Sequence, residues 1–421
     1  MKKAQQRIID LAYLKESREA NKQRLRENVI SNTDSGKDDF RLSPIVFIIV
    51  VLFCIAGIAF GIYWVTNRRL STEYSVQWER NSDDGTQTVE TFKGYKAFAG
   101  GIIKYTKDGA EYIDKKGNVV WERSYQLNSP IIEVSSKYAV IGDQGGTDLF
   151  IFDSTSMTGS SETIFPISIL KISDNGVVYG VLNDSAAEYI AAFKSDGTAI
   201  DLSVKSVVIG DGYPFDIAVS PDGTELLTSY VSIENGQINN NIVFRNFGAI
   251  GQNEDARRIV GGFKDEFAGF LAGRVNFSTN EYSQAFYDGG VAFFSTEVLN
   301  SPELIANERF DEKIETIGYS EEMVAVALSA ESSEASPKLL IYNCKGELKA
   351  SIDIDYKYSE MCVTGNSVVL RSGNEIHVYG KNGVLRANFE FTEGEITKIV
   401  GGGSDNELFA LTGNLLYRIR Y

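Results

Sequence analysis

Histidine and cysteine, the side chains that most often carry nucleophilic or metal chemistry, are scarce in this chain. His377 is the only histidine, which excludes multi-histidine metal sites and any histidine-paired nucleophile that does not use this residue. The three cysteines, Cys54, Cys344 and Cys362, are too few for a four-cysteine zinc site or a disulfide-rich scaffold. A structural role for His377, in a predicted strand, is therefore better supported than a catalytic one.

Carboxylates offer the second kind of candidate site. Asp353 and Asp355 are two positions apart, and residues 82–85 contain two adjacent aspartates, so either segment could begin an oxygen-ligand Ca²⁺ site. Neither segment has the further ligands of a calcium-binding loop, and aspartate in such segments ordinarily stabilises its own turn. The sequence therefore predicts no catalytic, cofactor-binding or metal-binding residue.

Composition and charge divide the chain into unlike parts. The 421 residues carry a net charge of −16, with 43% apolar residues and only 7 prolines, which is typical of a globular fold. Residues 1–43 hold 10 of the 41 Lys/Arg and 7 of the 57 Asp/Glu, a net charge of +3. Residues 44–66 hold none, which leaves −19 for residues 67–421. Because so acidic a domain repels phosphate backbones, we expect no nucleic-acid partner.

Residues 44–66 form an uncharged, apolar stretch of 23 residues. A helix of that length extends roughly 35 Å, enough to cross the ~30 Å hydrocarbon layer of a bilayer. Tyr63 and Trp64 lie where interfacial aromatic residues belong, and Arg68 and Arg69 follow them. Because no small-residue cleavage site comes after the stretch, we expect an uncleaved transmembrane helix, with the lipid bilayer as its partner.

The tail before this stretch gives the expected orientation. Its excess of basic residues favours a cytoplasmic N-terminus, which would put residues 67–421 outside the cytoplasm. Residues 4–30 lack glycine and proline and are predicted to be partly helical, whereas residues 31–41 are typical of a polar linker. The sequence thus predicts a single-pass protein of the cell membrane with a basic cytoplasmic tail over residues 1–43.

Beyond residue 67, one hairpin recurs along the chain. Short runs rich in Val, Ile, Tyr and Phe alternate with Asp-Gly, Lys-Gly and Asn-Gly turns, which is typical of β-structure. The seven turns repeat with a mean period of about 44 residues, the length of a four-stranded propeller blade. They lie at Gly117, Gly159, Gly197, Gly248, Glu297, Gly346 and Gly383.

The last repeat is incomplete, which indicates how a ring would close. Residues 415–421 alternate as a third strand should, and residues 74–80, before the first repeat, alternate in the same way. If residues 74–80 supply the missing outer strand, with Val76 and Trp78 on one face, no blade edge stays unpaired. We therefore predict an all-β, eight-bladed propeller over residues 67–421, closed by both termini. An irregular stretch at residues 262–290 leaves seven blades as the alternative.

Residues 219–227, which contain Ser-Pro-Asp-Gly at positions 220–223, resemble the hairpin of WD40-like and TolB-like bacterial repeats. The match is strong in one blade only, and no Trp-Asp dipeptide accompanies it. Taken whole, the basic tail, the single span and the acidic propeller resemble a family of bacterial membrane-anchored propeller proteins. That resemblance implies a fold and a location in the cell envelope, and it implies no activity.

Because no catalytic constellation is visible, the leading hypothesis is a scaffold outside the cell that binds an envelope protein or polymer. A hydrolase or lyase acting on an extracellular glycan or peptide is the alternative, since carboxylates from several blades could meet at the axis. A single-pass receptor is a third hypothesis. A deep axial pocket with convergent carboxylates would favour the enzyme, and an apolar patch the scaffold. We expect no cofactor, and we expect Cys344 and Cys362 to stay unpaired because their strands are not adjacent.

Overall fold

The computed structural model describes residues 19, 22, 51–58, 70–81, 94–234, 236–252, 257–330 and 336–421. The chain divides into two units, Met1–Arg68 and Arg69–Tyr421. In the first unit residues 51–58 are helical, whereas the rest of the predicted span and nearly all of the 1–43 tail lie outside the described residues. Among the residues that the structure describes, no helix is both long and apolar enough to cross a membrane.

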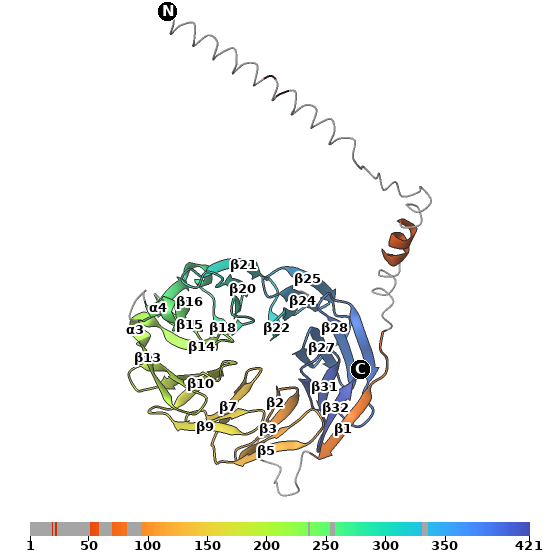
Figure 1. Cartoon of the computed structure of the whole chain (residues 1–421), viewed down its shortest axis with the longest axis horizontal. Helices are drawn as coiled ribbons and strands as arrows, with labels where there is room; N and C mark the ends of the chain where they lie inside the picture. Colours follow the sequence, from red (N-terminus) through yellow and green to blue (C-terminus); the bar gives the residue numbers. More distant parts are fainter. Residues whose placement is uncertain are drawn as a thin grey trace, which may run out of the picture. The chain divides into compact units, whose positions relative to one another are not determined.

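The second unit is a ring of eight four-stranded antiparallel sheets, or blades, seen face-on in Figure 1. The innermost strands of blades one to eight are β2 (Gly94–Phe98), β6 (Pro130–Val134), β10 (Ile167–Ile172), β14 (Tyr213–Val219), β18 (Ala272–Phe277), β22 (Ile314–Tyr319), β26 (Glu360–Thr364) and β30 (Lys398–Gly401). The second strands are β3 (Gly101–Tyr105), β7 (Tyr138–Asp143), β11 (Val178–Asn183), β15 (Glu225–Glu234), β19 (Tyr282–Tyr287), β23 (Met323–Leu328), β27 (Ser367–Ser372) and β31 (Glu407–Leu411).

The outer half of each blade completes the sheet. The third strands are β4 (Gly109–Ile113), β8 (Asp148–Asp153), β12 (Glu188–Phe193), β16 (Gln237–Asn246), β20 (Gly290–Ser295), β24 (Lys338–Asn343), β28 (Glu375–Gly380) and β32 (Leu415–Arg420). The outer strands are β5 (Val119–Ser124), β9 (Met157–Glu162), β13 (Ala199–Ser206), β17 (Ile259–Phe263), β21 (Glu303–Arg309), β25 (Leu348–Asp353), β29 (Leu385–Glu390) and, in blade eight, β1 (Ser75–Asn81). The short helices α3 (Val208–Asp211), α4 (Ala249–Gln252) and η1 (Asp265–Phe267) lie in connections.

The Ser-Pro-Asp-Gly turn illustrates how local sequence fixes a hairpin. Ser220 Oγ donates a hydrogen bond to Asp222 Oδ1 at 2.6 Å, and the backbone N–H of Thr224 donates to the same oxygen at 3.0 Å. Gly223 has a φ of +78°, a left-handed conformation that glycine adopts without strain. The backbone N–H of Asp222 donates to Asn280 Oδ1 in blade five at 2.9 Å, so the turn also ties two blades together.

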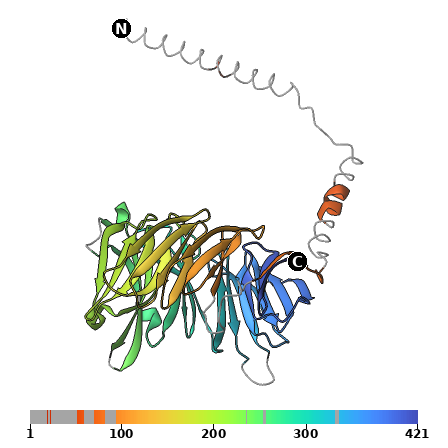
Figure 2. The same ribbon diagram turned by 90° about the horizontal axis from the view of Figure 1, so that it is seen from below.

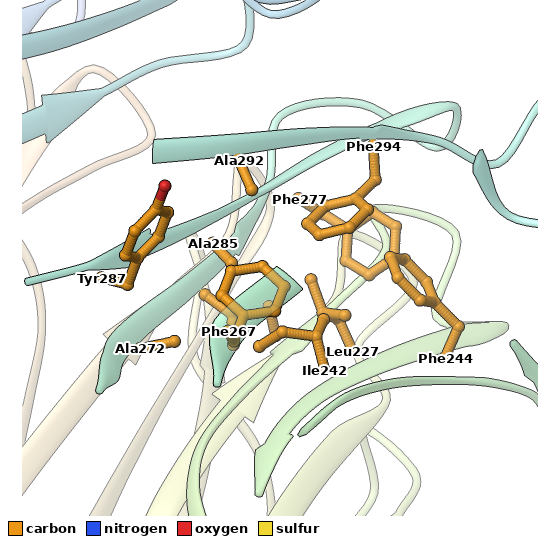
Figure 3. Close-up of a cluster of buried hydrophobic side chains, with 12 residues drawn as sticks. Leu227, Ile242, Phe244, Phe267, Ala272, Phe277, Ala285, Tyr287, Ala292 and Phe294 are labelled. Atoms are coloured by element: carbon orange, nitrogen blue, oxygen red, sulfur yellow. The ribbon is translucent and has the colours of Figure 1, made fainter. Parts of the chain in front are cut away.

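Hydrophobic side chains pack between neighbouring blades. The cluster in Figure 3 joins blade four to blade five, with Phe244 on β16 and Phe294 on β20 in a T-shaped pair whose ring centroids are 5.3 Å apart. Phe267 from η1 packs edge-on against Tyr287 at the same separation. The alternation of each strand supplies one apolar face to each neighbour, and this packing fixes the positions of the inner strands.

The predicted ring closure is confirmed. β1 pairs with β32 along its length, from Ser75 opposite Arg420 to Asn81 opposite Leu415. The order of blade eight is therefore β1-β32-β31-β30, with the outer strand taken from the other end of the ring's sequence. Eight blades are confirmed over the seven-blade alternative, because residues 262–290 contain η1 and the first two strands of a regular blade five.

Two details of the prediction are wrong. The register shifts between Val76 and Trp78, so the two side chains do not share a face. Val76 is 38% exposed, whereas the Trp78 ring is partly buried with its centroid 5.8 Å from that of Phe409. Gly159 lies inside β9, since the turn of blade two comes earlier, at residues 154–156.

The chain that leads into β1 also contacts blade seven. The Ser71 N–H donates to Arg386 O at 3.0 Å, and Asn388 N–H donates to Ser71 O at 2.9 Å, which adds a short parallel bridge to β29. The Tyr74 ring stacks on Phe391 with centroids 5.5 Å apart. The entering segment therefore joins the last two blades.

A partly buried ion network lies beside the closing strand, and we call it the seam network: the buried Glu407 and Arg418 and the exposed Arg420. Glu407 Oε2 lies 2.7 Å from Arg418 Nη2, and Oε1 lies 2.8 Å from Arg420 Nη2. Arg418 also donates a hydrogen bond to the backbone oxygen of Lys115 in blade one. The seam network thus holds blade eight against blade one.

Candidate functional site

The structure places His377 in structural surroundings. His377 is buried on β28, its ring stacks on Tyr356 with centroids 3.8 Å apart, and its Nε2 lies 3.2 Å from Glu375 Oε1. Asp353 ends β25, and residues 82–85 lie outside the described residues. Within the part of the chain that is described, no group of three or more His, Cys, Asp or Glu side chains could hold a metal ion.

The cysteines are free in the structure. Cys344 directly follows the third strand of blade six, and Cys362 lies on the innermost strand of blade seven. Burial raises the pKa of the Cys362 thiol far above its ordinary value, so this thiol stays protonated and unreactive.

A group of polar side chains that the sequence analysis did not single out converges near the ring axis. We call it the axial cluster, and each of the first six inner strands contributes one member. The members are Lys96, Glu133, Lys171, Asp216, Arg274 and Tyr319.

Ion pairs connect four members of the axial cluster. Lys171 Nζ lies 2.9 Å from Glu133 Oε1 and 4.0 Å from Asp216 Oδ1, so two carboxylates flank one ammonium. Arg274 Nε lies 3.7 Å from Asp216 Oδ2, which also accepts the backbone N–H of Val275 at 2.9 Å. The Arg274 side chain remains 43% exposed.

The surroundings set the charge of each member. Burial alone would raise the pKa of Glu133, but the ammonium groups of Lys171 and Lys96 hold it below its ordinary value. Burial alone would lower the pKa of Lys171, and Glu133 and Asp216 raise it. For Asp216 burial outweighs its cationic neighbours, so its pKa is raised. Glu133 and Lys171 are therefore a charged pair at neutral pH, neither acting as a free base.

The axial cluster borders a cavity of about 360 Å³. Lys96, Glu133, Lys171 and Tyr319 line it, together with the turns between the first and second strands of blades two to six. That volume is at the lower end of the range for small-molecule pockets. The axial carboxylates face cations, and an acid–base pair for hydrolysis needs carboxylates that are free to exchange protons.

Besides the axial cavity, a second candidate region lies on blade four. We call it the crest, and it comprises residues 207–211, 231–234 and 236–240. β15 and β16 are ten residues each and pair as far as Glu234 opposite Gln237. The cross-strand neighbours Ile233 and Ile238 are 77% and 44% exposed, and Ile209 on α3 is 92% exposed. α3 contacts β15, so Ile209 lies on an element packed beside the strand that carries Ile233.

The two regions lie on opposite faces of the ring. In an antiparallel sheet, successive turns lie alternately at the two ends of the strands. The cavity is lined by the turns that join first strands to second strands, so it lies at one of these ends. The crest hairpin joins a second strand to a third, and α3 joins two blades, so the crest is at the other end. Ser75 pairs with Arg420, near the C-terminus, at the cavity's end of the strands. In Figure 2, a side view, the C-terminus lies near the upper face of the ring.

A sequence signal for the axial cluster does exist. Lys96, Glu133, Lys171 and Asp216 are each the one charged residue of a largely apolar inner strand, as in Pro-Ile-Ile-Glu-Val for Glu133. Aligning the first strands of the repeats would have placed these residues side by side. A search for short sequence motifs does not find these residues, because each comes from a different repeat.

The fold and the two regions define a β-propeller whose axis is polar and whose blade four carries an apolar surface. The chain belongs to a family described as a family of unknown function (DUF5711), which matches residues 66–420. No curated protein matches the chain.

Solved structures resemble the ring in fold. BamB from Moraxella catarrhalis has a TM-score of 0.50 at 14% identity, over 83% of this chain and 100% of that one. Sqt1 from Chaetomium thermophilum, in a structure bound to the N-terminus of the ribosomal protein L10, has a TM-score of 0.52 at 12% identity. That match covers 81% of this chain and 100% of the Sqt1 chain. At these identities the likeness extends to the propeller fold.

Proposed function

We propose that the ring is a protein-binding scaffold and that the crest is its docking surface. The observation that carries the proposal is the exposure of Ile209, Ile233 and Ile238 on one projecting part of blade four. Apolar surface costs about 25 cal/mol per Å² when left in water, so a rigid cluster of exposed aliphatic side chains is typical of a binding surface. The ten-residue strands β15 and β16 hold this cluster away from the rest of the blade.

We also propose that residues 44–66 anchor the ring in the cell membrane, with the tail inside and the ring outside. The uncharged stretch and the basic tail support this arrangement. The entering segment reaches the ring on the cavity's face, opposite to the crest. A protein partner suits this surface better than a glycan, because exposed isoleucines offer no hydrogen bonds to sugar hydroxyls.

The hydrolase or lyase hypothesis finds less support in the axial cluster. Glu133 is held ionised by Lys171, and Asp216 lies between Lys171 and Arg274. The receptor hypothesis requires a partner that binds the tail, residues 1–43. Sqt1, a ring of similar fold, carries the N-terminus of another protein, and a protein segment is the kind of ligand that we propose for the crest.

Site-specific photo-crosslinking in cells tests the crest. A photoreactive residue at Ile233 in the full chain should give one discrete protein adduct, which mass spectrometry can identify. The further substitution Ile209→Ser should remove most of that adduct, because Ile209 lies on an element packed beside the strand that carries Ile233. Leu348, an exposed aliphatic residue on blade six, is the matched control position.

Equal adducts at positions 233 and 348, or an adduct at 233 that Ile209→Ser leaves unchanged, would contradict the proposal. An adduct made of two copies of this chain would assign the crest to self-association instead. Crosslinking to a polysaccharide would assign it to an envelope polymer.

A further inference from the structure

We propose that the axial cavity binds a small organic acid through a single carboxylate. The cavity and the crest lie on opposite faces, so this site is independent of the docking surface proposed above. Its volume of about 360 Å³ is roughly that of twelve water molecules, which suits a ligand of modest size.

Unused hydrogen-bond donors around the cavity indicate a ligand that accepts hydrogen bonds. Among the described residues, Lys96 and the Tyr319 hydroxyl have no hydrogen bond or ion pair, and both line the cavity. Tyr319 ends β22 and is itself partly buried. A buried hydroxyl without a partner is costly, so a group that satisfies it would bind favourably.

The charge of the axial cluster selects a monoanion. Its three cations, Lys96, Lys171 and Arg274, exceed its two carboxylates, Glu133 and Asp216, by one charge. A single carboxylate would balance this excess, whereas a phosphate dianion would leave a net negative charge beside the buried Asp216 and the partly buried Glu133.

The acidic groups at the cavity mouth do not reverse this preference. The Asp174 carboxylate accepts the backbone N–H of Ser136 at 2.8 Å, so one of its oxygens is occupied. Glu321 is exposed on its turn, where solvent and salt screen its charge. In this arrangement Lys96 and Tyr319 contact the carboxylate, while Lys171 and Arg274 supply positive charge behind them.

Benzoate is a suitable probe, with benzamide as its uncharged counterpart and inorganic phosphate as the dianion. Ligand-observed NMR with the purified full chain should detect benzoate binding and much weaker binding of benzamide and phosphate. Lys96→Gln should weaken benzoate binding about tenfold, the loss expected for one charge-assisted hydrogen bond. Tyr319→Phe keeps the ring that stacks on Phe286 and should weaken binding several-fold.

Lys137→Gln is the matched control, because Lys137 is exposed on the neighbouring turn outside the cavity. If Lys96→Gln and Lys137→Gln weaken benzoate binding equally, the effect is general electrostatic attraction, and the proposed site is wrong. Benzamide or phosphate binding as tightly as benzoate would overturn the carboxylate assignment. If an amidated glutamate dipeptide binds more tightly than benzoate, the ligand of the cavity is an acidic side chain of a protein. That result would contradict the proposal of a free small acid.

Discussion

Two charged networks in the ring use the same side-chain types in different ways. In the seam network both oxygens of Glu407 lie within 2.8 Å of an arginine nitrogen, and Arg418 reaches a carbonyl of blade one. In the axial cluster the separations run from 2.9 to 4.0 Å, and a cavity of about 360 Å³ borders the charges. A carboxylate with both oxygens paired indicates a network that holds blades together, whereas unused donors beside open space indicate capacity for a ligand.

The largest effect should come from removing the strand beside the seam network. Deleting residues 70–81 from the full chain exposes the edge of β32, whose residues Leu416, Tyr417 and Ile419 are buried. We expect an aggregating protein without a cooperative thermal transition, because an unpaired apolar edge is a template for association. Calorimetry and light scattering measure both effects.

Deleting residues 31–41, the polar linker, is the control for a shortened chain and should leave the melting of the ring unchanged. If both deletions melt alike and stay soluble, β1 is only a linker and the closure of the ring does not depend on it.

A smaller effect should follow from breaking the seam network at its carboxylate. Glu407→Gln leaves the buried Arg418 without a counter-charge, and we expect a loss of about 3 kcal/mol in the free energy of unfolding. Urea denaturation measures it. Glu347→Gln, which removes a carboxylate 64% exposed beside Lys349, should change stability by less than about 1 kcal/mol.

The contribution of Glu407 also has a pH signature. Burial alone would raise the pKa of Glu407, but hydrogen bonds from Arg418, Ser404 and Arg420 hold it below its ordinary value. The folded ring therefore binds this proton less readily than the unfolded chain, and stability falls as the pH drops through the lowered pKa. The difference between the native chain and Glu407→Gln should shrink over that acidic range, and a constant difference would contradict the network.

The smallest effect, with the opposite pH dependence, should come from the axial cluster. The raised pKa of Asp216 means that the folded ring binds its proton more readily than the unfolded chain, so this group reduces stability as the pH rises through that pKa. Asp216→Asn cannot ionise, so it should match the native chain at low pH and exceed its stability at neutral pH by no more than about 1 kcal/mol, since Lys171 and Arg274 offset part of the penalty in the native chain. A loss in the free energy of unfolding as large as that of Glu407→Gln would contradict this expectation, because the two networks would then contribute equally to the stability of the ring.

The fold followed from local features of the sequence, and the site did not. Turns such as Asp222-Gly223 and the alternation of residues 415–421 are set by near neighbours, so period, blade number and closure could be predicted. Glu133 and Lys171 are 38 positions apart and meet only because equivalent strands of adjacent blades converge on one axis. The register shift at β1 was missed for a related reason, because strand alternation alone does not reveal an inserted residue.

The pairing of β1 with β32 also dictates an order of events during synthesis. Ser75 and Arg420 are 345 positions apart, so the first strand to be translated waits for the last six-residue strand before it gains a partner. Blades one to seven contain all their own strands and can form as they emerge, whereas blade eight can form only after residues 415–420 have been synthesised. A chain that stops short of Leu415 would contain seven complete blades and an open ring, with β1 available to any other exposed edge.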